Sequence, residues 1–305
     1  MGTPDFAVFS LKSLIEAGHD ICAVITQPDK PRGRGYTLTP PPVKVSALEA
    51  GIPVYQPATL RDEAFASLLC ELDPEIIVVV AYGKILPVNV LEYPKYGCVN
   101  VHGSLLPEYR GAAPMQRAII DGKRVTGITT MYMAEGLDTG DMLLLEELTI
   151  EDDDNFETIH DKLGALGASL IVKTLAALAD GTAVRIPQDN SLASYAAKIE
   201  KSDQIIDFSR SAKELHDLIR GLSPIPLAFT HTPDGKLLKI ISARIEDADT
   251  AHTNAGEVIA LDGGITVACG QGSLTVTGVL PEGKGRMSAA DFIRGRKIAV
   301  GDMLK

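Results

Sequence analysis

Apolar residues in the first 200 positions form short continuous runs that alternate with amphipathic segments. The clearest run, residues 75–82, is rich in Ile and Val and is typical of a strand buried on both faces of a parallel sheet. Residues 21–26 form a shorter β-branched run and predict a second strand. Residues 7–17 and 62–72 carry helical patterns. This alternation predicts an α/β fold with a doubly wound, mostly parallel, Rossmann-like sheet.

The pattern changes after the long helix that apolar spacing predicts at residues 155–181. Residues 185–194 are polar and contain Pro187, which is typical of a linker. Beyond residue 227, short apolar runs alternate with Gly, Asp and Pro turns, which favours a small OB-like β-barrel. We therefore predict a catalytic domain at 1–185, a linker at 186–202 and an OB-like domain at 203–305.

At the start of the chain, residues 2–6 predict a loop of the kind that follows a first strand. No apolar run precedes this loop in the sequence. Because the first strand of a doubly wound sheet is internal, we expect the sheet to lack one of its inner strands.

Candidate chemistry lies where another predicted strand, residues 99–101, runs into a loop. Asn100 and His102 are two positions apart, so their side chains point to the same side of that strand. An Asn amide can donate to an oxygen that gains negative charge, and a His beside it can donate or relay a proton. A polar pair that only hydrogen-bonds its own loop is the alternative interpretation.

A carboxylate between two glycines, Asp138 between Gly136 and Gly140, strengthens the catalytic interpretation. Asp138 could accept a hydrogen bond from His102, fix its tautomer and favour its charged form. Asn100, His102 and Asp138 would then suit the transfer of an acyl group to an amine. The same Asp-Thr-Gly tripeptide occurs in aspartic proteases, but those enzymes need two such carboxylates, and this chain carries one inside an α/β pattern.

These segments closely resemble the folate-dependent formyltransferases. The resemblance is carried by Asn-x-His-x-Ser-Leu-Leu-Pro at 100–107, Tyr-Arg-Gly-Ala-Ala-Pro at 109–114 and Gly-Leu-Asp-Thr-Gly-Asp at 136–141. It implies transfer of a formyl group from the co-substrate 10-formyltetrahydrofolate to the α-amine of initiator methionyl-tRNA, for translation initiation. It also implies that Asn100, His102 and Asp138 are catalytic, and that a short apolar strand usually precedes the 2–6 loop.

The resemblance further implies two segments that contact the folate. The first is the loop after the Asn-x-His pair, with Ser104, Leu105, Leu106 and Pro107. The second is the turn after the 75–82 strand, which lines the pterin pocket partly through backbone groups, with Tyr82, Gly83, Ile85 and Leu86. From the residues alone, an ordinary strand-to-helix turn explains the second segment equally well.

A polar loop at residues 27–42 contains the basic residues Lys30, Arg32 and Arg34. Its two glycines lack the third glycine and the strand-helix context of a dinucleotide fingerprint. A solvated surface loop would explain it, whereas the resemblance implies an insertion that contacts the acceptor arm of tRNA, with Arg34 as its key arginine. The net charge is −11, and residues 207–305 hold 12 of the 29 basic and 12 of the 40 acidic residues. An RNA footprint would therefore be a local patch.

Four other classes of protein are alternatives to this function. A pure RNA-binding module would need no Asn-x-His pair with a distant Asp. A formyltetrahydrofolate hydrolase, a glycinamide ribonucleotide formyltransferase and a UDP-amino-sugar formyltransferase could share the three catalytic residues. Residues 207–305 count against the glycinamide enzyme, and the loop with Arg32 and Arg34, together with residues 110–114, counts against the sugar enzyme.

The remaining expectations concern metals, compartment and assembly. His102 and Asp138 lack a third ligand at a recognisable spacing, so no metal is implied. The cysteines, Cys22, Cys70, Cys98 and Cys269, contain no Cys-x-x-Cys pair and are expected to be reduced and mostly buried. No apolar run reaches the length of a membrane span. We expect a cytoplasmic monomer without a membrane partner.

Overall fold

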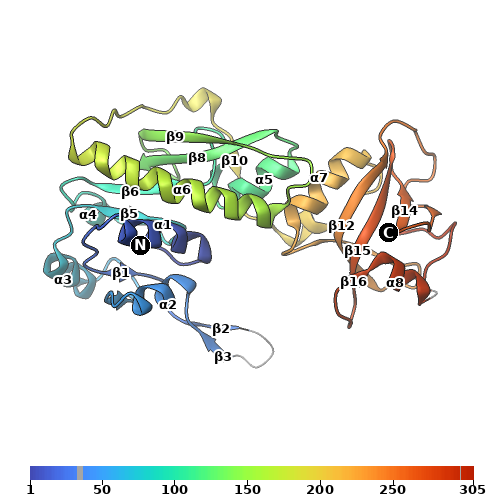
Figure 1. Ribbon diagram of the computed structural model, residues 1–305, viewed down its shortest axis with the longest axis horizontal. Helices are drawn as coiled ribbons and strands as arrows, with labels where there is room; N and C mark the ends of the chain where they lie inside the picture. The colour runs from blue at the N-terminus through green and yellow to red at the C-terminus, as the bar shows by residue number, and fades with distance from the viewer. Residues whose placement is uncertain (33–36, 296) are drawn as a thin grey trace. The chain divides into compact units, whose positions relative to one another are not determined.

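In the computed structural model, which describes residues 1–32, 37–295 and 297–305, the chain forms two compact units. The first unit consists of Met1–Gly111, Val125–Thr149 and His160–Tyr195 (Figure 1). The second consists of Ala112–Arg124, Ile150–Ile159 and Ala196–Lys305. Each unit therefore contains segments that are distant in sequence, whereas the domain boundaries at 185 and 203 remain a prediction.

A four-stranded sheet forms the centre of the first unit, in the order β5 (Ile77–Val79), β6 (Cys98–His102), β8 (Val125–Tyr132) and β9 (Met142–Thr149). β5 and β6 are parallel, but β8 is antiparallel to both β6 and β9. The sheet is thus mixed and not mostly parallel as predicted. The nine residues between β8 and β9 are too few for the crossover that parallel neighbours require.

A parallel pair, β1 (Val24–Ile25) and β4 (Val54–Tyr55), accompanies this sheet. Met1 and Gly2 lie between β1 and β5, where an inner strand was expected to be missing. The Gly2 amide donates to the Ile25 carbonyl (3.1 Å), and the Val80 amide donates to the Met1 carbonyl (2.9 Å). Beside them, residues of both strands line a cavity of about 440 Å³.

The α-amino group of Met1 faces this region and donates to the carbonyl of Val78 at 2.6 Å. Burial lowers the pKa of this amine from 8.0 to about 6. Two residues therefore bridge the gap between β1 and β5, and a buried amine sits beside the cavity.

Five helices belong wholly or mainly to the first unit: α1 (Asp5–Glu16), α2 (Pro42–Glu49), α3 (Glu63–Leu72), α4 (Val88–Leu91) and α6 (Phe156–Ala179). α6 lies along one face of the four-stranded sheet (Figure 1). Gly167 allows this close packing, because a Cβ there would lie 2.9 Å from Val101 on β6, and Gly164 likewise allows α1 to approach, because a Cβ there would lie 2.6 Å from Phe9.

α6 is also long and apolar enough to cross a membrane by length and composition, contrary to the expectation from the sequence. Its buried residues include Leu163, Leu170 and Ile171, each 3 % exposed or less. Burial of these side chains is typical of a helix that packs against the core of the first unit.

Within the polar loop at 27–42, the structure forms a hairpin that the sequence did not predict. β2 (Lys30–Arg32) pairs antiparallel with β3 (Thr37–Thr39), with Lys30 opposite Thr39. Two further short strands, β7 (Arg110–Gly111) and β10 (Tyr195–Ala196), pair with each other.

The second unit is built on a six-stranded antiparallel sheet. Its order is β11 (Ala228–His231), β12 (Leu237–Asp247), β15 (Ser273–Pro281), β14 (Ile265–Ala268) and β13 (Val258–Ala260), and β16 (Met287–Ser288) also pairs with β15. Three register shifts along the β12–β15 pair accompany the curl of this sheet. The described pairs do not join β11 to β13, so closure into a barrel remains a prediction.

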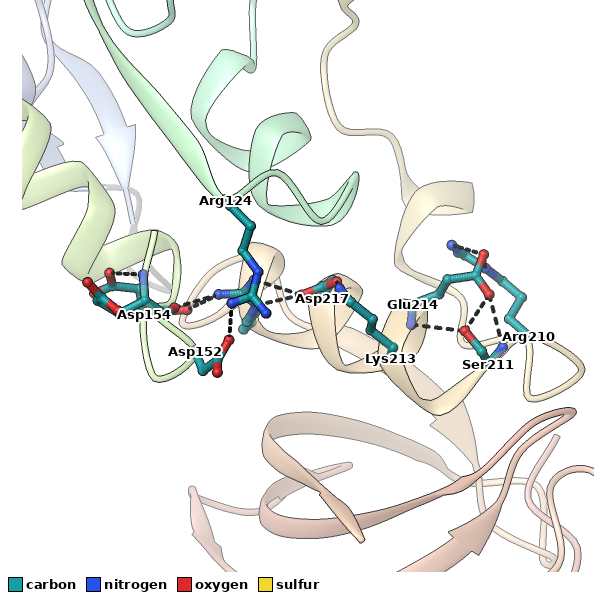
Figure 2. Close-up of polar contacts among 10 residues, drawn as sticks. Arg124, Asp152, Asp154, Arg210, Ser211, Lys213, Glu214 and Asp217 are labelled. Carbon is teal, nitrogen blue, oxygen red and sulfur yellow. Dashed lines mark hydrogen bonds and ion pairs between the residues drawn. The ribbon is translucent and has the colours of Figure 1, made fainter. Parts of the chain in front are cut away.

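Three helices complete the second unit: α5 (Pro114–Ile120), α7 (Ala212–Leu222) and α8 (Ala289–Arg294). α7 begins with a capping box, in which the Ser211 hydroxyl accepts from the Glu214 amide and the Glu214 carboxylate accepts from the Ser211 amide (Figure 2). Leu215 and Leu222 on α7 are fully buried in the core of the unit, with Leu238 and Ile240 from β12.

A polar network joins α7 to residues 150–159 (Figure 2). Asp217 accepts from the guanidinium of Arg220 at 2.8 Å, and from Lys213 at 2.8 Å. Arg220 also donates to the backbone carbonyls of Glu151 (3.0 Å) and Asp154 (3.1 Å). The Asp217 carboxylate and the Arg220 guanidinium are therefore hydrogen-bonded to each other. Arg220 also fixes the backbone turn between Glu151 and Asp154.

The cysteines divide evenly between core and surface. Cys98 on β6 and Cys269 are buried, and burial raises the pKa of these thiols to about 12 and about 11. Cys22 and Cys70 are exposed. The prediction of mostly buried cysteines is correct for two of the four, because an apolar neighbour in sequence does not fix which way a side chain points.

Candidate active site

Strand β6 supplies the two polar residues that the sequence singled out. It is buried along its whole length, with β5 parallel on one side and β8 antiparallel on the other. Asn100 lies opposite Val79 and Met131, and the strand period places its side chain on the same face as that of His102. Asn100 is 8 % exposed and His102 6 % exposed.

Asp138 reaches the same place from the loop between β8 and β9. Its Oδ2 lies 3.7 Å from Nδ1 of His102, which is an ion-pair distance and slightly longer than a hydrogen bond. The amide of Gly111 donates to the same Oδ2 at 2.8 Å. Asp138 has a φ of 51°, a left-handed conformation that is unfavourable for a residue with a Cβ. The structure thus brings together two residues that are 36 positions apart in the sequence.

The other ring nitrogen of His102 fixes the tautomer. Nε2 lies 3.0 Å from the carbonyl of Tyr109, and a carbonyl can only accept. Nε2 therefore carries a proton and donates it, which leaves Nδ1 toward Asp138. The Tyr109 amide in turn donates to the Ser194 hydroxyl at 2.9 Å, so the backbone that orients the imidazole is itself held.

Thr129 on β8 is a structural partner that the sequence analysis missed. Its hydroxyl donates to the Ser104 carbonyl at 2.8 Å and accepts from the Leu106 amide at 3.1 Å. Thr129 is fully buried, so this hydroxyl fastens the loop after β6 to the sheet. Threonine is common in strands, and Thr129 stands beside Thr130 and near Thr126, so nothing in the sequence singled it out.

Arg110 and Gln188 were also missed as parts of the site. Arg110 donates to the side-chain oxygen of Gln188 through Nε (3.0 Å) and Nη2 (2.8 Å). Gln188 donates to the carbonyls of Asp138 (2.9 Å) and Gly140 (2.7 Å). Arg110 lies within a motif that the sequence analysis quoted, whereas Gln188 lies in the segment predicted to be a linker and carried no signal.

The residues predicted to contact folate lie in different environments. In the loop after β6, Ser104 and Leu106 are buried, while Leu105 and Pro107 are partly exposed. The Ser104 hydroxyl donates to the Glu108 carbonyl at 2.7 Å. Leu105 packs against Gly127, where a Cβ would approach its side chain to 2.5 Å.

In the turn after β5, Tyr82 and Leu86 pack in a hydrophobic cluster, whereas Gly83 and Ile85 are exposed. The Tyr82 carbonyl accepts from Thr3 (2.9 Å) and from Gln27 (3.2 Å). Burial raises the pKa of the Tyr82 phenol to about 12. Of this turn, Ile85 and the Gly83 backbone are the parts open to solvent.

Of the basic residues predicted to contact RNA, Lys30 and Arg32 belong to β2. Lys30 is exposed on β2. Of Arg32 only the backbone is described, and Arg34 lies outside the described residues. At the base of the hairpin, Asp29 accepts from Lys44 (2.9 Å) and Gln56 (2.7 Å), and these hydrogen bonds, first that of Gln56, lower the pKa of its carboxyl.

The site therefore offers an amide donor, an imidazole and a carboxylate around one strand end. This set can stabilise a developing oxyanion and accept a proton from an attacking amine. Among the residues that the structure describes, no group of three or more His, Cys, Asp and Glu side chains could hold a metal ion.

Comparison with known proteins covers nearly the whole chain. A family model described as formyl transferase matches residues 1–175, and one described as formyl transferase, C-terminal domain, matches residues 198–297. A methionyl-tRNA formyltransferase of Pelotomaculum thermopropionicum is 49 % identical over 305 residues, covering 100 % of this chain and 97 % of the relative. A methionyl-tRNA formyltransferase of Lachnospira eligens is 48 % identical over 309 residues, with 100 % and 98 % covered.

Solved structures share the fold at much lower identity. An N-formyltransferase from Helicobacter canadensis, in complex with folinic acid and dTDP-3-aminofucose, has a TM-score of 0.66 at 19 % identity and covers 90 % of this chain and 96 % of its own. HypX from Aquifex aeolicus in complex with tetrahydrofolic acid has a TM-score of 0.62 at 16 % identity, covering 91 % of this chain and 47 % of its own.

Proposed function

The chain belongs to the formyl transferase family, and we propose that it transfers the formyl group of 10-formyltetrahydrofolate to the α-amine of initiator methionyl-tRNA. Two relatives named methionyl-tRNA formyltransferase, nearly half identical along the whole chain, support this substrate. The observation at the site that supports the chemistry is the approach of Asp138 to His102 at 3.7 Å, beside the Gly111 amide.

In the proposed reaction, the amine of the methionyl group attacks the formyl carbon, and a C–N bond forms as the carbonyl oxygen takes up negative charge. Asn100 hydrogen-bonds that oxygen, and His102 does so when protonated, through Nδ1–H, because its Nε2–H is engaged by the Tyr109 carbonyl. Asp138 orients His102 and takes the proton that the amine loses, directly or through water. The bond from the formyl carbon to N10 of the folate then breaks, and N10 receives a proton, so that tetrahydrofolate leaves.

Three observations support these proposed roles. Nε2 of His102 is already occupied by the Tyr109 carbonyl, so Asp138 meets the imidazole at Nδ1 only. Gly111 contributes one hydrogen bond to the Asp138 carboxylate and thereby holds it at the strand end. Asn100 shares the face of β6 with His102 and is the candidate for the main oxyanion donor.

The decisive experiment follows labelled formyl from 10-formyltetrahydrofolate with three acceptors in parallel. Methionyl-tRNA is expected to become labelled, a UDP-amino sugar is expected to stay unlabelled, and release of formate to water is expected to be slow. Labelling of the sugar alone would make the chain a sugar formyltransferase, the runner-up that the distant structure with dTDP-3-aminofucose brings into view. Formate release at the rate of transfer would indicate a hydrolase.

RNA recognition is proposed for Lys30 and Arg32 of β2 together with Arg34, and for the second unit as an OB-like tRNA-binding domain. Arg34→Ala is expected to raise the KM for methionyl-tRNA and to reduce the salt slope by about one unit, because one phosphate contact is lost. The KM for 10-formyltetrahydrofolate is expected to stay unchanged. An equal rise in both KM values would contradict a role confined to RNA. We further propose that the enzyme works as a monomer in the cytoplasm.

A further inference from the structure

The segment between the long helix and the second unit is tied to the sheet of the first unit. Ile186 and Met142 exchange two backbone hydrogen bonds of 2.9 Å, so residue 186 pairs with the first residue of β9. Two residues later, Gln188 meets the loop that carries Asp138. From this placement we propose that Gln188, oriented by Arg110, is a positioning residue for the Asp138 carboxylate, an inference that rests on the proposed function.

Both N–H groups of the Gln188 amide are directed at this loop. Its Nε2 lies 2.9 Å from the Asp138 carbonyl oxygen and 2.7 Å from the Gly140 carbonyl oxygen, with the weaker acceptor Sδ of Met131 at 3.9 Å. These carbonyls flank Thr139, so a single side chain fixes the backbone on both sides of the turn. A primary amide has two N–H donors, and both are used here.

Arg110 decides which way the amide faces. Its guanidinium donates twice to the Gln188 oxygen, and a guanidinium has no acceptor that could receive the amide NH₂. The oxygen must therefore face Arg110 and the NH₂ must face the loop. Arg110 is 2 % exposed and has no carboxylate partner among the described residues; its remaining acceptor is the side-chain oxygen of Asn190 at 2.9 Å.

The held loop needs this support, because Asp138 has the left-handed φ of 51°. Conformations of this kind persist only where surrounding contacts impose them. When the two carbonyl contacts are lost, Asp138 is free to relax to an ordinary conformation. Its carboxylate then leaves the position 3.7 Å from His102 Nδ1 and 2.8 Å from the Gly111 amide.

Gln188→Glu separates this role from a merely structural one. The substitution keeps the shape of the side chain and its contact with Arg110, now as an ion pair, but it directs a carboxylate oxygen at the two loop carbonyls. We expect kcat to fall by about 10- to 100-fold, as misplacement by around an ångström does. The KM for 10-formyltetrahydrofolate is expected to change by less than about twofold, and the Tm is expected not to fall.

Asn190→Asp is the matched control. It also places a carboxylate against Arg110 without changing the shape of the side chain, but Asn190 is exposed and makes no contact with the loop among the described hydrogen bonds. We expect its kcat to equal that of the wild type. A loss as large as that of Gln188→Glu would mean that the charge beside Arg110, and not the lost donors, causes the effect, and would overturn the proposal.

A double-variant cycle tests whether Gln188 acts through Asp138. If it does, Gln188→Glu added to Asp138→Asn should lower the residual kcat no further, because both changes remove the same interaction. A full additional loss, or a wild-type kcat in Gln188→Glu alone, would overturn the proposal. Hydrogen exchange of residues 136–141 should also quicken in Gln188→Glu, and this readout does not depend on the acceptor. Failure of the wild type to formylate methionyl-tRNA would instead refute the proposed function.

Discussion

Arg110 and Arg220 are both buried, one in each unit, yet they are satisfied by different kinds of acceptor. Arg220 pairs with the carboxylate of Asp217, which is 3 % exposed, and holds two backbone carbonyls. Arg110 holds the neutral side-chain oxygens of Gln188 and Asn190. The difference teaches that one arginine balances a local charge and fixes the fold, whereas the other fixes the orientation of an amide beside the candidate active site.

Removing Arg220 should give the largest effect on stability. Arg220→Met leaves the buried Asp217 carboxylate without its main partner, so we expect the free energy of unfolding to fall by about 3–5 kcal/mol. Urea unfolding of the full chain measures this loss. Arg220→Met combined with Asp217→Leu should recover part of it, since no unpaired buried charge remains. A double variant less stable than the single one would contradict the proposed charge balance.

On the catalytic side of the comparison, Asn100→Ala should lower kcat by about 10²–10³-fold, equivalent to about 2.7–4 kcal/mol of transition-state stabilisation. The physical reason is the loss of an oxyanion donor from a buried strand. Steady-state transfer of formyl to methionyl-tRNA measures it, and urea unfolding checks that the variant folds. A well-folded variant with unchanged kcat would remove Asn100 from the mechanism.

The Met1 amine sharpens the comparison as a third buried basic group, one that donates to a backbone carbonyl and whose charge burial disfavours. Its pKa falls from 8.0 to about 6 on folding, so the unfolded chain binds the proton more tightly between these values. Stability should therefore rise from pH 6 to pH 8, by about 3 kcal/mol at most from this group. Urea unfolding across that range measures the rise. Protein whose Met1 carries an N-formyl group lacks the titrating amine. An equal rise in stability in that form would show that another group causes the pH dependence.

The smallest effect should come from the exposed partner of the second-unit network. Lys213 donates to Asp217 at 2.8 Å, but its own side chain is 59 % exposed. Lys213→Met should cost less than about 1 kcal/mol, and this cost should shrink in high salt. Measured in the same urea series, a loss equal to that of Arg220→Met would show that burial is not what separates the two cations.

Much of the framework was predictable from the sequence, because continuous apolar runs mark buried strands. The runs at 75–82 and 21–26 contain β5 and β1, and the strand predicted at 99–101 lies within β6. Local pattern also marks the start of α7, where Ser211 and Glu214 stand at the spacing of a capping box and form one. The apolar pattern alone does not tell whether β8 runs parallel or antiparallel to its neighbours. The prediction of a mostly parallel sheet was therefore wrong.

The same limit applies to the candidate site: local pattern predicts which residues share a face or a loop, but not which distant residues meet. Strand period alone places Asn100 and His102 on one face, and the spacing of 136–141 marks a tight loop. The distance between His102 and Asp138 depends on the pairing of β6 with β8, which no local pattern encodes. Gln188 was out of reach for the same reason: it lies 50 residues from the carbonyl it holds, in a polar stretch without periodicity.

The bridge formed by Met1 and Gly2 has a practical consequence for producing the protein. Any residues joined to the Met1 amine would begin beside Val78, next to the cavity, and not at the surface. The first of these residues would have to be apolar and extended to be accommodated there, and a run of histidines is neither apolar nor strand-forming. Lys305 is exposed, but its backbone exchanges hydrogen bonds with His231, so a purification handle joined there needs a spacer that leaves this pairing intact.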